Sequence, residues 1–114
     1  MKLVTKAIKE KLEKNFRRTM ETGESGDVVL KLFGGGAMTW LITDIDPEDG
    51  DTMMGLCDIG MGCCEFGSVS LSELQSTKFP PFGLGVERDL SFKGGPVSKF
   101  QEYYDIHNTL NGCK

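Results

Sequence analysis

The chain has 114 residues, and its 13 Lys and Arg against 17 Asp and Glu give a formal net charge of −4. This length fits one domain, residues 1–114, that can bury a core without a metal ion or disulfides. No run of about 18 apolar residues is present, which excludes a membrane-spanning helix. Lysines interrupt the apolar residues near the N-terminus, which argues against a secretory signal, so we expect a cytoplasmic protein.

Charged residues are unevenly distributed along the chain. Residues 1–18 carry seven basic and two acidic side chains, a net +5, whereas residues 19–114 carry six basic and fifteen acidic side chains, a net −9. Such a division bears on partners and on electrostatic steering rather than on fold. Its simplest interpretation is a solvated basic helix face on an acidic protein.

Three helices are predicted. Residues 6–18 have apolar side chains at four-residue spacing behind an N-cap, Thr5. The Ser-Leu-Ser-Glu of residues 70–73 is a capping box that opens a short second helix. A third helix is expected from Ser98, with a glutamine three residues later as its own capping box, to a C-terminal cap at Gly112.

Five short apolar segments bounded by glycine or proline predict strands over residues 28–33, 37–45, 52–59, 63–69 and 86–92. Residues 78–85 are expected to form an irregular loop, and the last strand to direct Val86, Leu90 and Phe92 inward. Tightly connected strands pair antiparallel. The expected fold is therefore α+β, an antiparallel sheet of four or five strands with the N-terminal and C-terminal helices packed on it.

The strand over residues 37–45 is the most apolar of these segments. Alternation predicts Met38, Trp40 and Ile42 on one face, with Trp40 buried beneath a helix. Leu41 and Ile45 are then expected on the opposite face.

An acidic run begins near the end of this strand and consists of Asp44, Asp46, Glu48, Asp49 and Asp51. In a calcium-binding EF-hand loop, glycine occupies position six and a bidentate glutamate position twelve. Counted from Asp44, Gly50 falls at position seven and Gly55 at position twelve, so the motif is absent. Pro47 and Gly50 favour a turn with a solvated charge cluster. This cluster is the candidate contact surface for a partner with a cationic groove.

The sequence contains no residue pattern that indicates an enzyme active site. The four cysteines, Cys57, Cys63, Cys64 and Cys113, lack the spacing of a structural zinc site and are expected to be free thiols. The one histidine, His107, falls on the apolar side of the third predicted helix, so a hydrolase using it with a cysteine is a remote alternative. We expect no catalytic activity, cofactor or metal.

Nucleic-acid binding is the other open interpretation, because Lys9, Arg17 and Arg18 of the first predicted helix could contact phosphates. Aromatic residues are not interleaved there, and the chain as a whole is acidic. The basic helix and the acidic run therefore both remain candidate contact surfaces.

Four segments resemble a family of roughly 100-residue bacterial proteins that plasmids, prophages and conjugative elements carry and whose domain has no assigned function. They are residues 3–6 (Leu-Val-Thr-Lys), residues 39–43 (Thr-Trp-Leu-Ile-Thr) leading into residues 46–50 (Asp-Pro-Glu-Asp-Gly), residues 70–74 (Ser-Leu-Ser-Glu-Leu) and residues 85–92 (Gly-Val-Glu-Arg-Asp-Leu-Ser-Phe). They occur in the family's order over nearly the whole chain. The sequence differs from the family at residues 63–67 and in the extended C-terminal helix.

Proteins similar to this family are described as anti-CRISPR proteins, which inhibit the type II RNA-guided DNA nuclease. The resemblance therefore implies an inhibitor acting in the bacterial cytoplasm on that nuclease or its guide-RNA complex, with no catalytic residues. The alternative is a mobile-element accessory protein that binds nucleic acid through its basic N-terminal helix.

Overall fold

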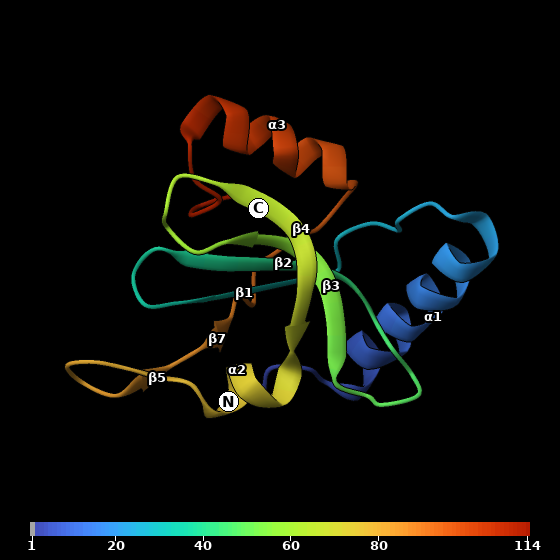
Figure 1. The fold of residues 1–114 in the computed structure, drawn as a ribbon, viewed down its shortest axis with the longest axis horizontal. Helices are drawn as coiled ribbons and strands as arrows, with labels where there is room; N and C mark the ends of the chain where they lie inside the picture. The colour runs from blue at the N-terminus through green and yellow to red at the C-terminus, as the bar shows by residue number, and fades with distance from the viewer. Residues whose placement is uncertain (1) are drawn as a thin grey trace.

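A five-stranded antiparallel sheet forms the centre of the computed structural model, which describes residues 2–114 (Figure 1). In the order β4-β3-β2-β1-β7, its strands are β4 (Cys64–Ser70), β3 (Thr52–Asp58), β2 (Met38–Ile45), β1 (Leu30–Gly34) and β7 (Glu87–Arg88). The helices are α1 (Lys6–Thr22), α2 (Leu71–Ser76) and α3 (Val97–His107). The α+β fold with an antiparallel sheet and helices near both ends of the chain is confirmed.

The two faces of the sheet carry separate apolar cores. On one face, Trp40 of β2 is buried with Leu12 of α1 and Leu74 of α2. On the other face, Leu41 of β2 is buried with Phe100 of α3. The alternation of side chains along β2 thus places a helix on each side of the sheet, as Figure 1 shows.

Helix α1 begins where predicted and runs one turn further. The Thr5 hydroxyl accepts a hydrogen bond from the Ile8 N–H (3.3 Å), which confirms the N-cap. The helix continues past residue 18 to Thr22 and ends at Gly23, which is left-handed (φ 76°) and donates its N–H to the Thr19 carbonyl (2.8 Å). Glycine adopts this conformation without strain, which is why the helix stops there.

Strand β2 contains a bulge at Thr43, and this changes the predicted faces. Ile42 pairs with Gly55 and Asp44 with Met54, so Thr43 has no partner residue in the register. Beyond a bulge the side-chain alternation shifts by one residue. Ile45 therefore packs in the core of Ile42 and Trp40, and its predicted placement beside Leu41 was wrong.

Helix α1 stabilises the bulge directly. The Asn15 side-chain amide donates to the carbonyl of Thr43 (2.8 Å) and to that of Asp27 (3.1 Å). The Thr43 hydroxyl in turn hydrogen-bonds the Met54 carbonyl (3.1 Å). Since buried backbone groups need partners, these bonds satisfy the polar atoms that the interrupted ladder leaves open.

The segment after residue 77 differs from the prediction at both ends. Residues 78–85 form a hairpin of β5 (Lys78–Phe79) and β6 (Leu84–Gly85) rather than an irregular loop. The strand expected over residues 86–92 contains only β7. The Asp89 carboxylate accepts hydrogen bonds from the N–H and hydroxyl of Ser91 (both 2.9 Å), and such a local turn competes with a strand. Leu90 is consequently 74% exposed.

Helix α3 begins one residue earlier than expected and ends without the predicted glycine cap. Pro96 occupies its N-cap position with no side-chain hydrogen bond, so a capping box at Ser98 was wrong. The helix ends at His107 because Asn108 takes the left-handed conformation (φ 55°), which asparagine tolerates better than most residues. Gly112 lies beyond the helix.

A pair of facing glycines provides a test of how closely β2 approaches β3. Gly55 of β3 and Gly67 of β4 are partners in the register, yet a Cβ at Gly55 would overlap the Leu41 carbonyl oxygen while a Cβ at Gly67 would meet no atom within 4 Å. We expect Gly55→Ala to lower the free energy of unfolding by about 1–3 kcal/mol or more, as overpacking does. Gly67→Ala should be neutral or stabilising by up to about 1 kcal/mol. Urea denaturation of both variants checks this, and equal stabilities would contradict it.

Candidate functional site

The acidic turn, defined here as Asp46 to Asp51 between β2 and β3, uses several of its carboxylates to hold its own backbone. Asp46 accepts a hydrogen bond from the Glu48 N–H (2.9 Å). Asp49 accepts from the N–H groups of Asp51 (2.8 Å) and Thr52 (3.0 Å) and from the Thr52 hydroxyl (2.7 Å). These bonds, those to Thr52 foremost, hold the pKa of Asp49 below its usual value. The predicted turn is confirmed.

Asp51 joins the acidic turn to helix α2. Its carboxylate accepts hydrogen bonds from the Ser70 hydroxyl (2.6 Å) and the Ser72 N–H (2.8 Å), and these lower its pKa. The Ser70 hydroxyl itself caps α2 by accepting from the Glu73 N–H (3.3 Å), as the capping box predicted. Asp51 is therefore a structural residue as much as a surface charge.

The remaining two acidic candidates have opposite environments. Asp44 is only 6% exposed, so its predicted role in a contact surface is corrected. Burial raises the pKa of its carboxyl, an effect that a hydrogen bond from the Thr43 hydroxyl (3.1 Å) opposes. Glu48 is exposed, and among residues 2–114 no side-chain hydrogen bond is found for it. Of the five acidic residues, Glu48 offers its charge most completely to solvent.

The basic residues of the N-terminal segment are all exposed: Lys2, Lys6, Lys9, Lys11, Lys14, Arg17 and Arg18. They do not form one face. Lys9 and Arg18 are nine residues apart, about two and a half helical turns, and so lie on opposite sides of α1. Lys9 faces the acidic turn, since its ammonium lies 3.6 Å from where a Cβ of Gly50 would be. The proposed trio of Lys9, Arg17 and Arg18 is therefore divided between two surfaces.

Lys31 of β1 is a buried charge that sequence reasoning missed. It is 5% exposed, and its ammonium donates to the Cys113 carbonyl (2.8 Å) and lies 3.6 Å from the Asp89 carboxylate. Buried charges need such partners. A lysine between two leucines in an apolar strand was the available signal, but its main partner lies 82 residues away in the sequence.

Asp58, at the end of β3, is a second buried charge that anchors the C-terminal segment. One carboxylate oxygen accepts from the Gly60 N–H (2.9 Å) and the other from the Leu110 N–H (2.9 Å). The same carboxylate therefore closes the β3–β4 turn and holds the chain after α3 against the sheet. Together with Lys31, it explains why the tail packs on the core.

The four cysteines are free thiols, as predicted, and Cys57, Cys64 and Cys113 do not resemble activated nucleophiles. Burial, and then the Asp58 charge, raise the pKa of Cys64 to about 11, whereas a nucleophilic cysteine needs a lowered pKa. His107 packs its ring against Tyr103, with 4.2 Å between centroids. The cavity beside Cys64 is lined by Tyr104 and residues of α3 other than His107. The cysteine–histidine pairing has no geometric support.

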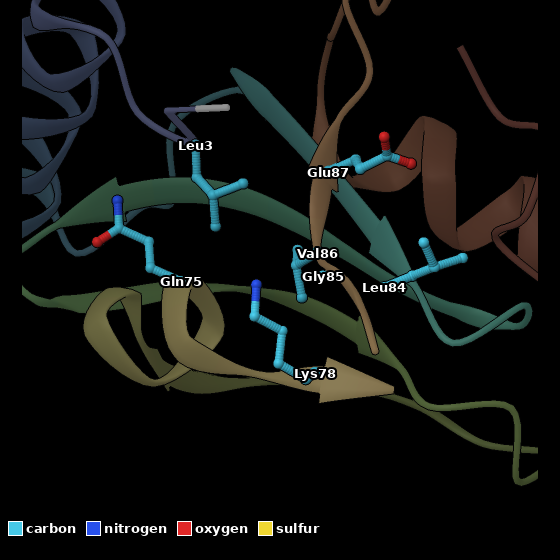
Figure 2. Close-up of a pocket in the computed structure, with 7 residues that line it drawn as sticks. All are labelled: Leu3, Gln75, Lys78, Leu84, Gly85, Val86 and Glu87. Carbon is cyan, nitrogen blue, oxygen red and sulfur yellow. The ribbon is translucent and has the colours of Figure 1, made fainter. Parts of the chain in front are cut away.

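A cavity of about 370 Å³ lies between Leu3, α2 and the β5–β6 hairpin (Figure 2). The Lys78 side chain extends toward Gly85 and Val86, while the Glu87 carboxylate points away. A cation without an acid–base partner is not a catalytic arrangement. Among residues 2–114, no group of three or more metal-ligating side chains is found, and none of the described helices is long and apolar enough to cross a bilayer.

The acidic turn gives a pH-dependent test. The folded-state pKa values of Asp49 and Asp51 are lowered, so their ionised forms stabilise the fold above the unfolded pKa of about 3.9, and this stabilisation is lost as pH falls through the folded values. We expect Asp49→Asn and Asp51→Asn to be less stable than the wild type at pH 7. The difference should shrink below about pH 4, where the wild-type carboxyls also become neutral.

Urea denaturation between pH 7 and pH 2.5 measures this difference. The raised pKa of Asp44 has the opposite effect on stability, but it is present in every variant and cancels. Glu48→Gln is the matched control and should show no difference at any pH. A difference for Asp49→Asn that stays constant down to pH 2.5 would contradict the assignment.

Comparison with known proteins identifies the family to which the chain belongs. A family model described as a protein of unknown function (DUF2958) matches residues 3–110. No curated protein and no solved structure matches the chain. The matched range runs from the segment before α1 to the residue that Asp58 anchors, and so includes the whole sheet and all three helices. The chain therefore belongs to the DUF2958 family of proteins of unknown function.

Proposed function

We propose that this protein is a non-catalytic inhibitor that binds a type II RNA-guided DNA nuclease in the bacterial cytoplasm and prevents DNA cleavage. Four sequence segments resemble a family to which proteins described as anti-CRISPR inhibitors are similar, and this resemblance supports the class of target. An acidic protein can occupy the cationic groove of such a nuclease by competing with nucleic acid for the same field.

The distribution of exposed charge is the observation that carries this proposal. After residue 18, three of the six basic side chains are turned to carbonyls of the protein itself: Lys31 to Cys113, Arg88 to Lys2 and Leu3, and Lys99 to Gly94 and Lys114. Ten of the fifteen acidic residues in the same range are exposed, namely Glu21, Glu24, Asp27, Glu48, Asp49, Glu65, Glu73, Glu87, Glu102 and Asp105. Four basic side chains are exposed in this range, so the exposed side chains after residue 18 carry a net charge of −6 and the field outside this part of the molecule is negative.

Binding and cleavage assays test the proposal. The purified protein is mixed with nuclease–guide complexes from several type II subtypes, captured through a tag on the nuclease, and assayed for cleavage of a matched DNA. We expect capture with at least one complex and a loss of cleavage that more DNA relieves. Absence of capture and full cleavage with every complex would overturn it.

The acidic turn is tested within the same assay by Glu48→Gln. This residue is exposed and holds no part of the turn through its side chain, whereas Asp51 also positions α2. We expect unchanged stability and association slowed by about twofold, with a weaker salt dependence. Glu24→Gln, in the loop after α1, is the control on a different surface. Equal association rates for both variants would exclude the acidic turn from the contact.

A second candidate function is nucleic-acid binding through α1, because its basic residues are all exposed. Lys11, Lys14 and Arg18 have the spacing i, i+3 and i+7, which places them on one side of the helix. Replacing these three by glutamine should abolish salt-dependent DNA binding, whereas Lys9→Gln, on the side facing the acidic turn, should change it little. Binding to DNA without any nuclease would favour this function over inhibition.

A further inference from the structure

The two edges of the sheet differ in a way that concerns partner binding. At one edge, β7 has two residues, Glu87 and Arg88, and a turn follows at Asp89. At the other edge, β4 has seven residues, contains neither proline nor lysine, and carries Glu65 as its one charge. Proteins protect exposed edges by shortness, charge, proline or bulges, since open backbone groups recruit another strand. Of these protections, strand β4 has only the single charge of Glu65.

The register identifies which backbone groups of β4 point outward. The Leu71 N–H donates to the Asp51 carbonyl (2.9 Å), and these two residues continue the β3–β4 register. Hydrogen-bonded and non-hydrogen-bonded pairs alternate in an antiparallel ladder. The N–H and C=O groups of Cys64, Phe66 and Ser68 are therefore directed away from β3. No described strand pairs with this edge.

A cavity adjoins the same edge on the face covered by α3. It measures about 290 Å³ and is lined by Cys64, Gln101, Tyr104 and Asp105. The Tyr104 hydroxyl oxygen is buried and has no hydrogen-bond partner among residues 2–114. A carboxylate, an amide oxygen and a phenol oxygen all accept hydrogen bonds, so this cavity is suited to a cationic donor such as an ammonium or guanidinium group.

The charges around this edge point to the chemistry of the occupant. Glu65 on β4 and Glu102 and Asp105 on α3 are exposed. The one lysine of α3, Lys99, donates instead to the carbonyls of Gly94 and Lys114. A second copy of this chain would bring the same acidic groups against each other, which opposes association. A basic segment would be attracted.

We propose that β4 binds an extended basic segment of a partner protein as a sixth strand, with one lysine or arginine side chain of that segment in the cavity beside Asp105. Backbone hydrogen bonds to Cys64, Phe66 and Ser68 supply affinity, and the cavity supplies selectivity for a cation. Seven residues of strand span about 24 Å, enough for three outward-facing pairs. This surface is distinct from the acidic turn and does not depend on nuclease inhibition.

The experiment titrates the ¹⁵N-labelled protein with a blocked seven-residue peptide, Thr-Arg-Val-Arg-Val-Arg-Thr. We expect saturable binding and chemical-shift changes centred on residues 64–68 and 101–105. A peptide with glutamate at the three arginine positions should not bind. A peptide of the first sequence with N-methyl groups on alternate amides keeps the charge but cannot pair, and it should bind at least tenfold more weakly.

Protein variants separate the cavity from the edge. Asp105→Asn should weaken binding of the arginine peptide about tenfold, the effect of removing one charged hydrogen-bond partner. Ser68→Pro removes an outward N–H and should abolish binding while β3 pairing is kept, with Ser68→Ala as the matched control. Glu87→Gln, at the opposite edge, should bind as the wild type does.

Three results would overturn the proposal. If the N-methylated peptide binds as tightly as the unmethylated peptide, the contact is non-specific electrostatic attraction without backbone pairing. If Asp105→Asn binds the arginine peptide as tightly as the wild type does, the cavity takes no part in the contact. Dimerisation of the free protein that Ser68→Pro abolishes would assign the edge to a second copy. If Ser68→Pro does not fold, the N-methylated peptide still decides the role of the backbone, because it leaves the protein unchanged.

Discussion

The bulge at Thr43 is the constraint on which the rest of the sheet depends. It directs Ile42 and Ile45 to the same core although they are three residues apart, and just before it the Leu41 carbonyl lies so close to β3 that only glycine fits at position 55. Asn15 connects this irregularity to α1 and to the loop at Asp27. The position of the basic helix relative to the sheet is therefore determined by polar bonds as well as by apolar packing.

The sequence predicted most of this fold because most elements depend on local signals. Threonine at an N-cap, serine at a capping box and alternating apolar residues each specify their own segment, and α1, α2 and the first four strands formed near their predicted positions. The failures came where a local polar bond competed with periodicity. Asp89 ended a strand by bonding to Ser91, and the bulge at Thr43 left no mark in the apolar pattern.

The candidate site was predictable only in part for a related reason. Acidic residues were identified as a surface on a turn, but the sequence does not show that the Asp51 carboxylate reaches α2 or that Asp44 is buried. The two charges that organise the C-terminal segment, Lys31 and Asp58, have partners 82 and 52 residues away, and no local pattern encodes such distances.

The environments of the four thiols have a practical consequence for chemistry on this protein. Cys57, Cys64 and Cys113 are at least partly buried, and their raised pKa values leave little thiolate at neutral pH. Cys63 is exposed in the turn between β3 and β4. Because maleimides and iodoacetamides react with accessible thiolate, they should select Cys63 in the native protein without removal of the other cysteines. A fluorophore or spin label attached there sits at one end of the open edge of β4, so the wild-type chain already carries its own attachment point for a reporter.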